Sequence, residues 1–157
     1  SVKCWGRSDE GQMGKGAKKG PLWQIGDGEL EMGDNLIAIK LDSTATAIAA
    51  GYHHICAILD NSSIKCWGFN ASGQLGQEDT SLIWSSSDLD NLNSIDLGTE
   101  RTARAIAAGD NHTCVVLDDA SIKCWGSNTA GQLGLGHTNN RGDNSGEMGD
   151  DLPVISL

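Results

Sequence analysis

Short apolar runs alternate with polar turns along the chain, and the clearest pair lies at residues 112–117 and 121–125. Both runs are rich in β-branched residues, which is typical of strands, and they flank a polar turn at residues 118–120. Aspartate and asparagine suit such a turn because they tolerate left-handed backbone and bond to it locally. A near copy of the whole pattern occupies residues 53–68, with its turn at residues 60–62. The pattern therefore predicts two antiparallel β-hairpins.

The hairpins belong to a repeat with a period of about 58 residues. The segment Ala-Ile-Ala-Ala-Gly begins at Ala47 and again at Ala105. The segment Lys-Cys-Trp-Gly occurs at residues 3–6, 65–68 and 123–126, and each copy is followed by Gly-Gln-Met-Gly or Gly-Gln-Leu-Gly. Self-similarity at a fixed period is the signature of a repeat architecture. The chain therefore holds somewhat under three units.

Two further segments of each unit are expected to be strands. Residues 102–109 and their counterpart at 47–51 carry small side chains, which favours a crowded position near a central axis. The segments at residues 36–41, 94–97 and 153–157 precede the same place in the unit and are expected to form a fourth strand. No stretch has convincing amphipathic helical spacing. One small sheet cannot bury its faces alone, so the predicted fold class is all-β, a β-propeller segment of about two and a half to three four-stranded blades.

With these motifs in view, the chain resembles the regulator of chromosome condensation repeat family. Residues 105–136 carry the resemblance, and residues 47–76 match nearly as well. The resemblance implies a seven-bladed ring of four-stranded blades, of which this chain supplies about a third. We expect the end of one blade and a linker at residues 1–41, a second blade at 42–98 and a third at 99–157. The sequence opens inside a repeated motif, so we expect the remaining blades to lie in the same longer chain.

The repeated motif has structural roles that follow from its residue types. Gly73 and Gly76 permit backbone angles that other residues disfavour. Leu75 is expected to fill a gap between blades, and Gln74 is expected to satisfy backbone groups of its loop. Trp67 offers a large buried area and an indole N–H that can reach a polar partner. The same roles are expected at Trp125, Gly131, Gln132, Leu133 and Gly134.

Each hairpin carries two cysteines placed symmetrically about its turn. Cys114 and Cys124 are centred on Asp119, in the middle of the predicted turn. Residues related in this way lie directly opposite each other on antiparallel strands, within reach of a disulfide. We therefore predict disulfides between Cys114 and Cys124 and, in the upstream hairpin, between Cys56 and Cys66.

Two alternatives stay open for these cysteines: buried free thiols and a metal site. His112 and Cys114 are two positions apart on one strand face, with Cys124 opposite, and such a set could bind zinc with an open position. His54 stands in the same relation to the upstream pair. The match to the repeat motif instead favours hydrogen-bonded strand residues for both histidines. Cys4 is expected to find its disulfide partner outside this chain, with an intermolecular bond as the alternative.

Paired disulfides imply an oxidising compartment, so we expect an extracellular or cell-surface protein of the secretory pathway. Three Asn-x-Ser/Thr sequons point the same way, at Asn61, Asn70 and Asn111. Asn61 lies in a hairpin turn, where a glycan could project into solvent.

The charge balance restricts the partners. The chain has 21 Asp and Glu against 11 Lys and Arg, a formal net charge of −10. Proteins that bind nucleic acid need a basic face, so no nucleic-acid partner is expected. The basic residues are dispersed, and Lys15, Lys18 and Lys19 are the densest cluster. No apolar run approaches the length of a membrane span of about 20 residues.

Binding is expected to be set where the units differ, at residues 15–29, 77–93 and 135–151. The last of these is acidic and glycine-rich, and its spacing does not fit an EF-hand. Its simplest interpretation is a connection between strands with Asp turns. A weak calcium candidate within it consists of Asp143, Glu147, Asp150 and Asp151.

The middle variable stretch carries three consecutive apolar residues, Leu82, Ile83 and Trp84. An exposed tryptophan there could mark a contact with another protein subunit. Packing on its own blade is the other interpretation.

We predict a non-catalytic extracellular propeller that serves as a protein-interaction or structural module, with no cofactor. The sequence offers no nucleophile–base pair, no phosphate-binding glycine loop leading into a helix and no repeated acid pair. Because one fold hosts unlike activities, two alternatives stay open. They are a guanine-nucleotide exchange factor or chromatin-type regulator, as for the namesake of the family, and an inhibitor of a secreted enzyme.

Overall fold

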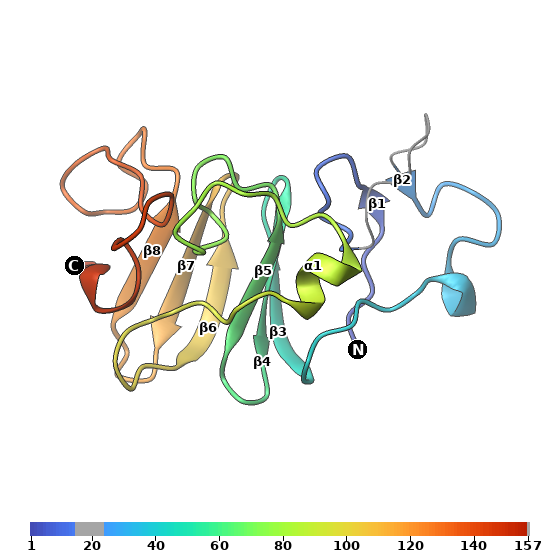
Figure 1. Ribbon diagram of the computed structural model, residues 1–157, viewed down its shortest axis with the longest axis horizontal. Coiled ribbons are helices and arrows are strands. Elements are labelled where there is room, and N and C mark those ends of the chain that lie inside the picture. Colours follow the sequence, from blue (N-terminus) through green and yellow to red (C-terminus); the bar gives the residue numbers. More distant parts are fainter. Residues whose placement is uncertain (15–23, 157) are drawn as a thin grey trace.

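The computed structural model describes residues 1–14 and 24–156, with three small antiparallel sheets side by side in chain order (Figure 1). The predicted basic cluster Lys15, Lys18 and Lys19, and most of the variable stretch that begins with it, lie outside the described residues. The strands are β1 (Gly6–Arg7), β2 (Gln24–Ile25), β3 (Ala45–Ala50), β4 (His54–Leu59), β5 (Ile64–Gly68), β6 (Ala103–Ala108), β7 (His112–Leu117) and β8 (Ile122–Gly126). The helices are η1 (Gly33–Asn35), α1 (Ser86–Asp90) and η2 (Gly149–Asp151).

Both predicted hairpins are confirmed. β4 pairs with β5, and β7 pairs with β8, each in an antiparallel register. In the first turn the Asn61 side chain accepts hydrogen bonds from the backbone and hydroxyl of Ser63. In the second turn Asp119 accepts the same two bonds from Ser121. These bonds explain why Asn and Asp occupy the turns, since the side chain replaces a backbone acceptor.

The small residues of β3 and β6 meet where neighbouring sheets come closest. A Cβ atom placed on Gly51, just after β3, would lie 2.5 Å from the carbonyl oxygen of Gly109, just after β6. The Tyr52 amide also donates to the Asp110 carbonyl across this junction, at 3.1 Å. The crowded position predicted from the alanines and glycines is therefore confirmed, and side-chain volume here would push the sheets apart.

The expected fourth strand is reduced to one backbone hydrogen bond in each unit. In the first unit the Ile39 amide donates to the Val2 carbonyl at 2.8 Å. In the next two units the Ile95 amide donates to Ile64 of β5 at 3.0 Å, and the Ile155 amide donates to Ile122 of β8 at 2.8 Å. After Ile95 the chain turns at once, because the Asp96 side chain accepts from the Gly98 amide. Pro153 has no amide to extend the pairing. Two of the sheets therefore have three strands, each with a short bonded segment at its outer edge.

A short helix, α1, lies in the middle variable stretch, where none was expected. The Ser85 side chain accepts from the Asp88 amide and the Asp88 side chain accepts from the Ser85 amide, which is a capping box. Five residues are too few to show a helical period in the sequence. None of the helices in the described parts of the chain has the length and apolar character needed to cross a membrane.

The hydrophobic core lies between the sheets. One cluster joins Ile58 of β4 to Val115 of β7 and Trp125 of β8, with Leu75 fully buried between them. A second cluster joins Trp67 of β5 to Cys4 and Met13 of the first unit. Leu75 therefore fills a gap between blades, as predicted. Each blade buries its apolar surface against the next one.

The turns at residues 73–76 and 131–134 offer a matched test of this packing. Gly73 and Gly131 share one motif position and nearly the same φ, 77° and 76°. A Cβ atom on Gly73 would lie 2.3 Å from the Asp143 nitrogen, whereas none of the surroundings of Gly131 comes within 4 Å. We expect Gly131→Ala to cost about 1–2 kcal/mol of unfolding free energy from left-handed backbone alone. We expect Gly73→Ala to cost about 1–3 kcal/mol more, because the third unit must shift.

Chemical denaturation of the two variants measures the difference. Equal losses of unfolding free energy would contradict the tight contact between the turn and the third unit.

Candidate functional site

The most constrained part of the molecule is the junction at which the turn of one unit enters the next. The Trp67 indole donates to the Gln12 carbonyl, and the Trp125 indole donates to the Gln74 carbonyl, both at 3.0 Å. Both indole rings are fully buried. The Gln74 side chain accepts from the Ser72 amide at 2.9 Å and so holds its own turn in shape. The roles predicted for tryptophan and glutamine are therefore confirmed.

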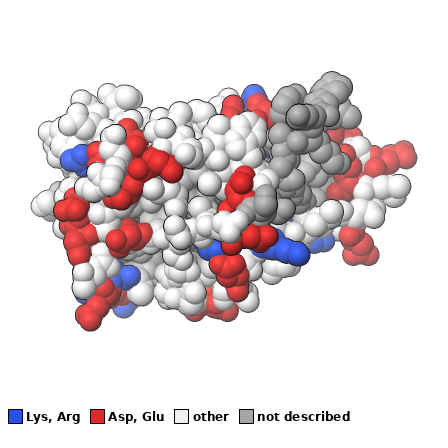
Figure 2. Space-filling model, in the orientation of Figure 1, with Lys and Arg blue, Asp and Glu red and all other residues white. Residues whose placement is uncertain are grey.

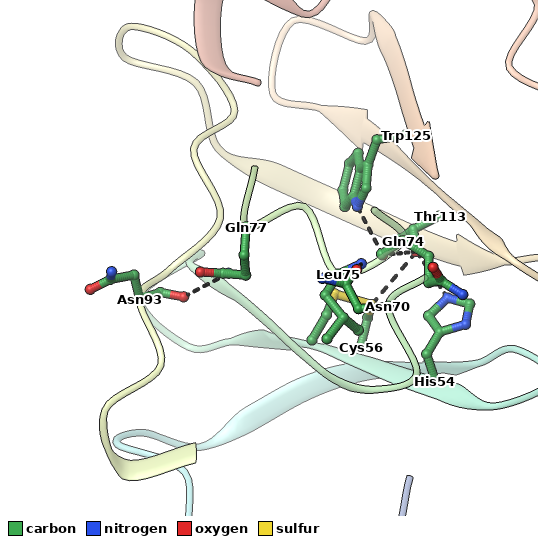
Figure 3. Close-up of a disulfide and its surroundings, with 10 residues drawn as sticks. His54, Cys56, Asn70, Gln74, Leu75, Gln77, Asn93, Thr113 and Trp125 are labelled. Carbon is green, nitrogen blue, oxygen red and sulfur yellow. Dashed lines mark hydrogen bonds between the residues drawn. A yellow bond between two sulfur atoms is a disulfide. The ribbon is translucent and has the colours of Figure 1, made fainter. Parts of the chain in front are cut away.

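A chain of buried polar groups runs through the second junction (Figure 3). The Thr113 hydroxyl donates to the Gln74 carbonyl at 3.0 Å and lies 3.0 Å from Nε2 of His54. A hydroxyl has one proton to donate, so His54 must donate from Nε2 and carries no proton on Nδ1. Nδ1 is buried without a hydrogen-bond partner among the described residues. Burial, with the nearby charge of His112, lowers the pKa of His54 to about 4.

Both predicted disulfides are present, and they exclude the zinc set and the free thiols in these hairpins. Cys56 is bonded to Cys66, and Cys114 is bonded to Cys124, with Cα atoms 4.0 and 4.1 Å apart. Sulfur atoms in a disulfide cannot serve as thiolate ligands. Cys4 is buried in the cluster around Trp67. Its expected partner outside this chain stays a prediction.

The three sequons lie in different surroundings. Asn61 is exposed at the tip of its hairpin. Asn70 is fully buried, where its side chain accepts from the Leu75 amide and donates to the Asp79 carbonyl, both at 2.9 Å. A glycan on Nδ2 of the buried Asn70 would disturb its bond to Asp79, so the fold does not leave this sequon accessible. Asn111 is half-buried and accepts from the Gln74 side chain at 3.2 Å. Asn61 is the sequon that the fold leaves accessible.

The apolar stretch Leu82, Ile83 and Trp84 packs within the chain. Ile83 exchanges two backbone hydrogen bonds with Gly68 and touches both core clusters. The turn of the first unit rests on it, since a Cβ atom on Gly11 would lie 2.7 Å from the Trp84 Cα. All three side chains are half-buried. Of the two interpretations, packing within the chain is the one that these contacts support, and a contact with another subunit stays a prediction.

The acidic loop does not assemble the calcium candidate. Glu147 accepts from the backbone amides of Gly142 and Asn144, and Asp150 accepts from the Thr99 amide at 2.8 Å. Asp151 is exposed. Burial and the neighbouring Glu147 carboxyl raise the pKa of Asp143, which disfavours a second charge beside Glu147. Across residues 1–14 and 24–156, no three His, Cys, Asp or Glu side chains are placed to share a metal ion.

An open groove lies beside β3, and sequence reasoning missed it. The groove encloses about 410 Å³, and its lining includes Trp5, Ile48 and Tyr52, which are 60%, 51% and 65% exposed. Lys3 and Arg7 supply positive charge at its edge. Among the charged side chains on the face shown in Figure 2, acidic ones outnumber basic ones. No sequence signal distinguishes Trp5 from its buried counterparts Trp67 and Trp125, because all three lie in the same motif.

A comparison with known proteins identifies two repeat units along the chain. The family model for the regulator of chromosome condensation (RCC1) repeat matches residues 45–74 and 103–132. The ultraviolet-B receptor UVR8 of Arabidopsis thaliana is 28% identical over 124 residues, which is 75% of this chain and 26% of that protein. The probable E3 ubiquitin-protein ligase HERC4 of Homo sapiens is 37% identical over 100 residues, 64% of this chain and 9% of that protein. The chain thus spans about a quarter or less of these relatives.

Solved structures agree with the fold. Yeast RCC1 (Prp20), crystallised with Kap60, has a TM-score of 0.60 at 21% identity and covers 83% of this chain and 26% of its own. Human WBSCR16 has a TM-score of 0.64 at 14% identity and covers 96% of this chain and 33% of its own. At these identities the likeness shows the fold, and the present chain is a propeller segment.

The buried histidine predicts how stability depends on pH. The unfolded chain binds a proton on His54 near pH 6.5, whereas the folded chain binds it near pH 4. Neutral His54 therefore makes its full contribution to the free energy of unfolding above pH 6.5. This contribution falls by about 3 kcal/mol in total as the pH drops from 6.5 toward 4. Urea denaturation at several pH values in this window measures the slope.

His54→Gln should remove this part of the slope, and His53→Gln should keep it. If the unfolding free energy of His54→Gln depends on pH as steeply as that of the original chain, a group other than His54 titrates in this window.

Proposed function

Because this chain is built from regulator of chromosome condensation repeats and belongs to that repeat family, we propose that it is a non-catalytic interaction module that works outside the cell. The relatives support the general role, which is a propeller scaffold for protein interaction or regulation. The extracellular part is our own inference. The observation that carries it is a disulfide in each of the two complete hairpins.

The two disulfides support an oxidising compartment because they are repeated structural features. Each joins opposite residues of adjacent strands, at the same place in successive units. Cys56, Cys66 and Cys124 are almost completely buried. Disulfides of this kind persist in secreted proteins and are rare in the reducing cytosol and nucleus. A bond maintained in every complete unit indicates that the protein folds where it can form.

Other proteins are the partner class that the surface favours. The groove beside β3 combines exposed Trp5 and Tyr52 with the positive charge of Arg7. Aromatic residues and arginine are enriched at the centres of protein interfaces. The formal net charge of −10 opposes a phosphate backbone. We therefore propose protein subunits, including further blades of the same propeller, as the partners.

One relative of known structure, Prp20p of Saccharomyces cerevisiae, has binding properties toward Gsp1p and histones. The acidic balance of the present chain disfavours contact with the DNA of chromatin, because a phosphate backbone rewards positive charge. An interaction module in an extracellular assembly accounts for both the charge and the disulfides.

The compartment is tested by mapping disulfides in protein recovered from its native source. Free thiols are alkylated before any reductant is added, and the peptides are then weighed. We expect the peptides of Cys56 and Cys66, and those of Cys114 and Cys124, to be linked and unalkylated. Full alkylation of all four cysteines in the native protein would overturn the extracellular proposal.

Glycosylation gives a second readout with a control in the same chain. Expressed through a eukaryotic secretory pathway, the protein should carry a glycan on Asn61, which Asn61→Gln removes. Asn70→Gln should leave the glycan mass unchanged, because Asn70 is buried in the folded chain. A glycan on Asn70 in folded protein would contradict the hydrogen bonds of that side chain.

A further inference from the structure

A polar pocket opens on the loop that follows β8 in the third unit. It encloses about 450 Å³, and the described residues that line it are all polar or charged, among them Arg141 and Asp143. Two residues at its mouth, Thr138 and Asn139, are exposed. Residues 80–81, their counterparts in the second unit, are exposed as well, although that unit has a neighbour on each side. The opening is therefore a property of the loop itself.

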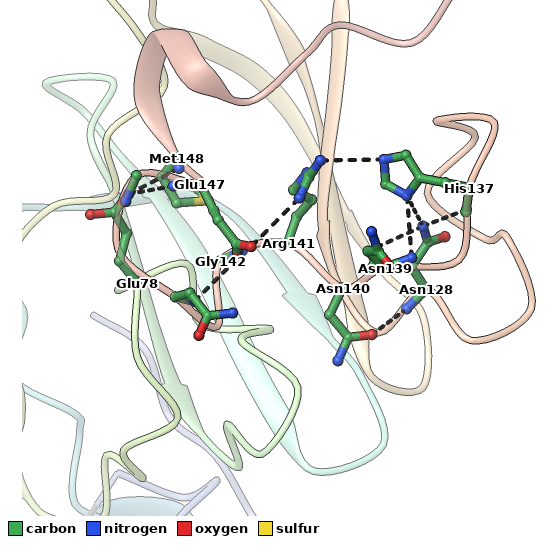
Figure 4. Close-up of polar contacts among 11 residues, drawn as sticks. Glu78, Asn128, His137, Asn139, Asn140, Arg141, Gly142, Glu147 and Met148 are labelled. Carbon is green, nitrogen blue, oxygen red and sulfur yellow. Dashed lines mark hydrogen bonds and ion pairs between the residues drawn. The ribbon is translucent and has the colours of Figure 1, made fainter.

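Two glutamates hold the loop that carries the pocket. Glu147 accepts from the Gly142 and Asn144 amides at 3.0 and 3.1 Å. Glu78 of the second unit accepts from the three successive amides of residues 146–148 at 2.9–3.0 Å (Figure 4). Hydrogen bonds to an ionised acceptor are about twice as strong as neutral ones. The pocket is therefore preformed, which lowers the cost of binding a ligand.

Arg141 occupies a position that is apolar in the other two units. Its backbone pairs with the glycine of the Lys-Cys-Trp-Gly motif, and the backbones of Ile25 and Ile83 pair with the same glycine in their units. Both isoleucines pack against the hydrophobic core. A charged side chain has therefore replaced an apolar one at the pocket of the third unit.

The shape of the loop does not require Arg141. In the first unit Glu31 accepts from two loop amides at 2.8 and 3.1 Å, in the same way as Glu147. The first unit achieves this with Ile25 at the position of Arg141. The arginine therefore serves a purpose other than forming the loop.

The guanidinium of Arg141 has few acceptors around it. Nη1 lies 3.5 Å from Oε1 of Glu147, at the limit of a hydrogen bond, and Nε is buried without a partner among the described residues. Oδ1 of Asp143 is also buried without a partner in the described parts of the chain. Buried polar atoms are rarely left unpaired in folded proteins, and those that are call for a water, an ion or a ligand. The residues of this one pocket thus hold both an unpaired donor and an unpaired acceptor.

The ring of His137 turns a second donor toward Arg141. The Asn139 amide donates to Nδ1 at 3.2 Å, so we assign the ring proton to Nε2. Nε2 lies 3.3 Å from Nη2 of Arg141, and a guanidinium can only donate (Figure 4). Two N–H groups therefore face each other, and the oxygen of a ligand can accept from both.

Charge and residue type select the class of ligand. Arg141 and Glu147 carry opposite charges, so the pocket has no excess of positive charge for an anion such as phosphate. Its described lining has no apolar residue to contact an apolar side chain of a peptide. A hydroxyl group can both accept and donate a hydrogen bond. It therefore matches a pocket in which donors and a carboxylate acceptor occur together, and sugars carry such groups on neighbouring carbons.

We propose that this pocket binds a saccharide through two neighbouring hydroxyl groups, one accepting from Arg141 and His137 and the other donating to Asp143. The volume of about 450 Å³ lies in the usual range for small-molecule sites. This inference goes beyond the proposed function, because it adds a glycan to the protein partners of the module.

The test is an NMR titration of the ¹⁵N-labelled protein with the methyl glycosides of glucose, galactose, mannose and N-acetylglucosamine. We expect at least one glycoside to shift the amides of residues 138–144 and the Nε–H signal of Arg141, with a Kd in the millimolar range. Arg141→Ile restores the residue of the other two units, so it should fold and should weaken binding by about tenfold or more. Arg104→Ala, an exposed arginine of β6 outside the pocket, should leave binding unchanged.

A second variant keeps the test independent of the folding of Arg141→Ile. Arg141→Lys retains the charge but loses the fork of N–H groups, so it should also weaken binding. The proposal fails if all four glycosides leave residues 138–144 unmoved at concentrations up to about 100 mM. It also fails if both Arg141 variants bind as well as the original chain, or if inorganic phosphate shifts these residues more strongly than every glycoside. Disulfide mapping reads the compartment and this titration reads the pocket, so the two proposals can fail separately.

Discussion

The structure depends on one hydrogen-bonded contact, in which a carbonyl of one unit accepts the indole proton of the next. The Gln74 carbonyl accepts from both Trp125 and Thr113. A buried indole without this acceptor would lose a hydrogen bond in a place that water cannot reach, at a cost of about 1–3 kcal/mol. The core around Trp125 is therefore complete only when the turn of the preceding unit is in place. This requirement makes the junction between blades the unit of stability.

Each disulfide bond joins two strands of one hairpin, whereas the polar junction joins two successive units. Each disulfide joins strands that are already neighbours in sequence, so it stabilises a hairpin by restricting the unfolded chain. The Cys56–Cys66 disulfide also packs in the core between the second and third units, with Cys56 Sγ 3.8 Å from the Thr113 hydroxyl oxygen. Cohesion between blades comes from Leu75, the tryptophans and the bonds made by Gln74, Thr113 and His54. The covalent bond itself lies within one unit, so it keeps a hairpin closed whether or not the neighbouring junction is closed.

Sequence reasoning reached features set by local pattern and missed those set by distant contacts. The hairpins and both disulfides follow from the symmetry of Cys114 and Cys124 about one turn. The fourth strand was overpredicted, because Ile95 has the right residue type but Asp96 turns the chain away. Asn70 satisfied a three-residue sequon, and its burial depends on a loop that closes through Leu75 and Asp79. Glu78 was hidden in a variable stretch, since its partners are 68–70 positions away. Its one signal was its place directly after the repeated turn, in the unit that precedes the Glu-Met-Gly-Asp loop.

The acidity of the chain takes on a second meaning once its carboxylates are followed to their partners. Glu31, Glu147 and Glu78 all accept backbone amides in glycine-rich loops, and Asp119 does so in a hairpin turn. Each carboxylate replaces a strand or helix as the acceptor for loop amides. Loops held in this way keep a fixed shape without the backbone pairing of a strand or helix. Carboxylates acting within a loop preserve its shape, and Glu78 joins the turn of the second unit to a loop of the third. Part of the negative charge is therefore structural.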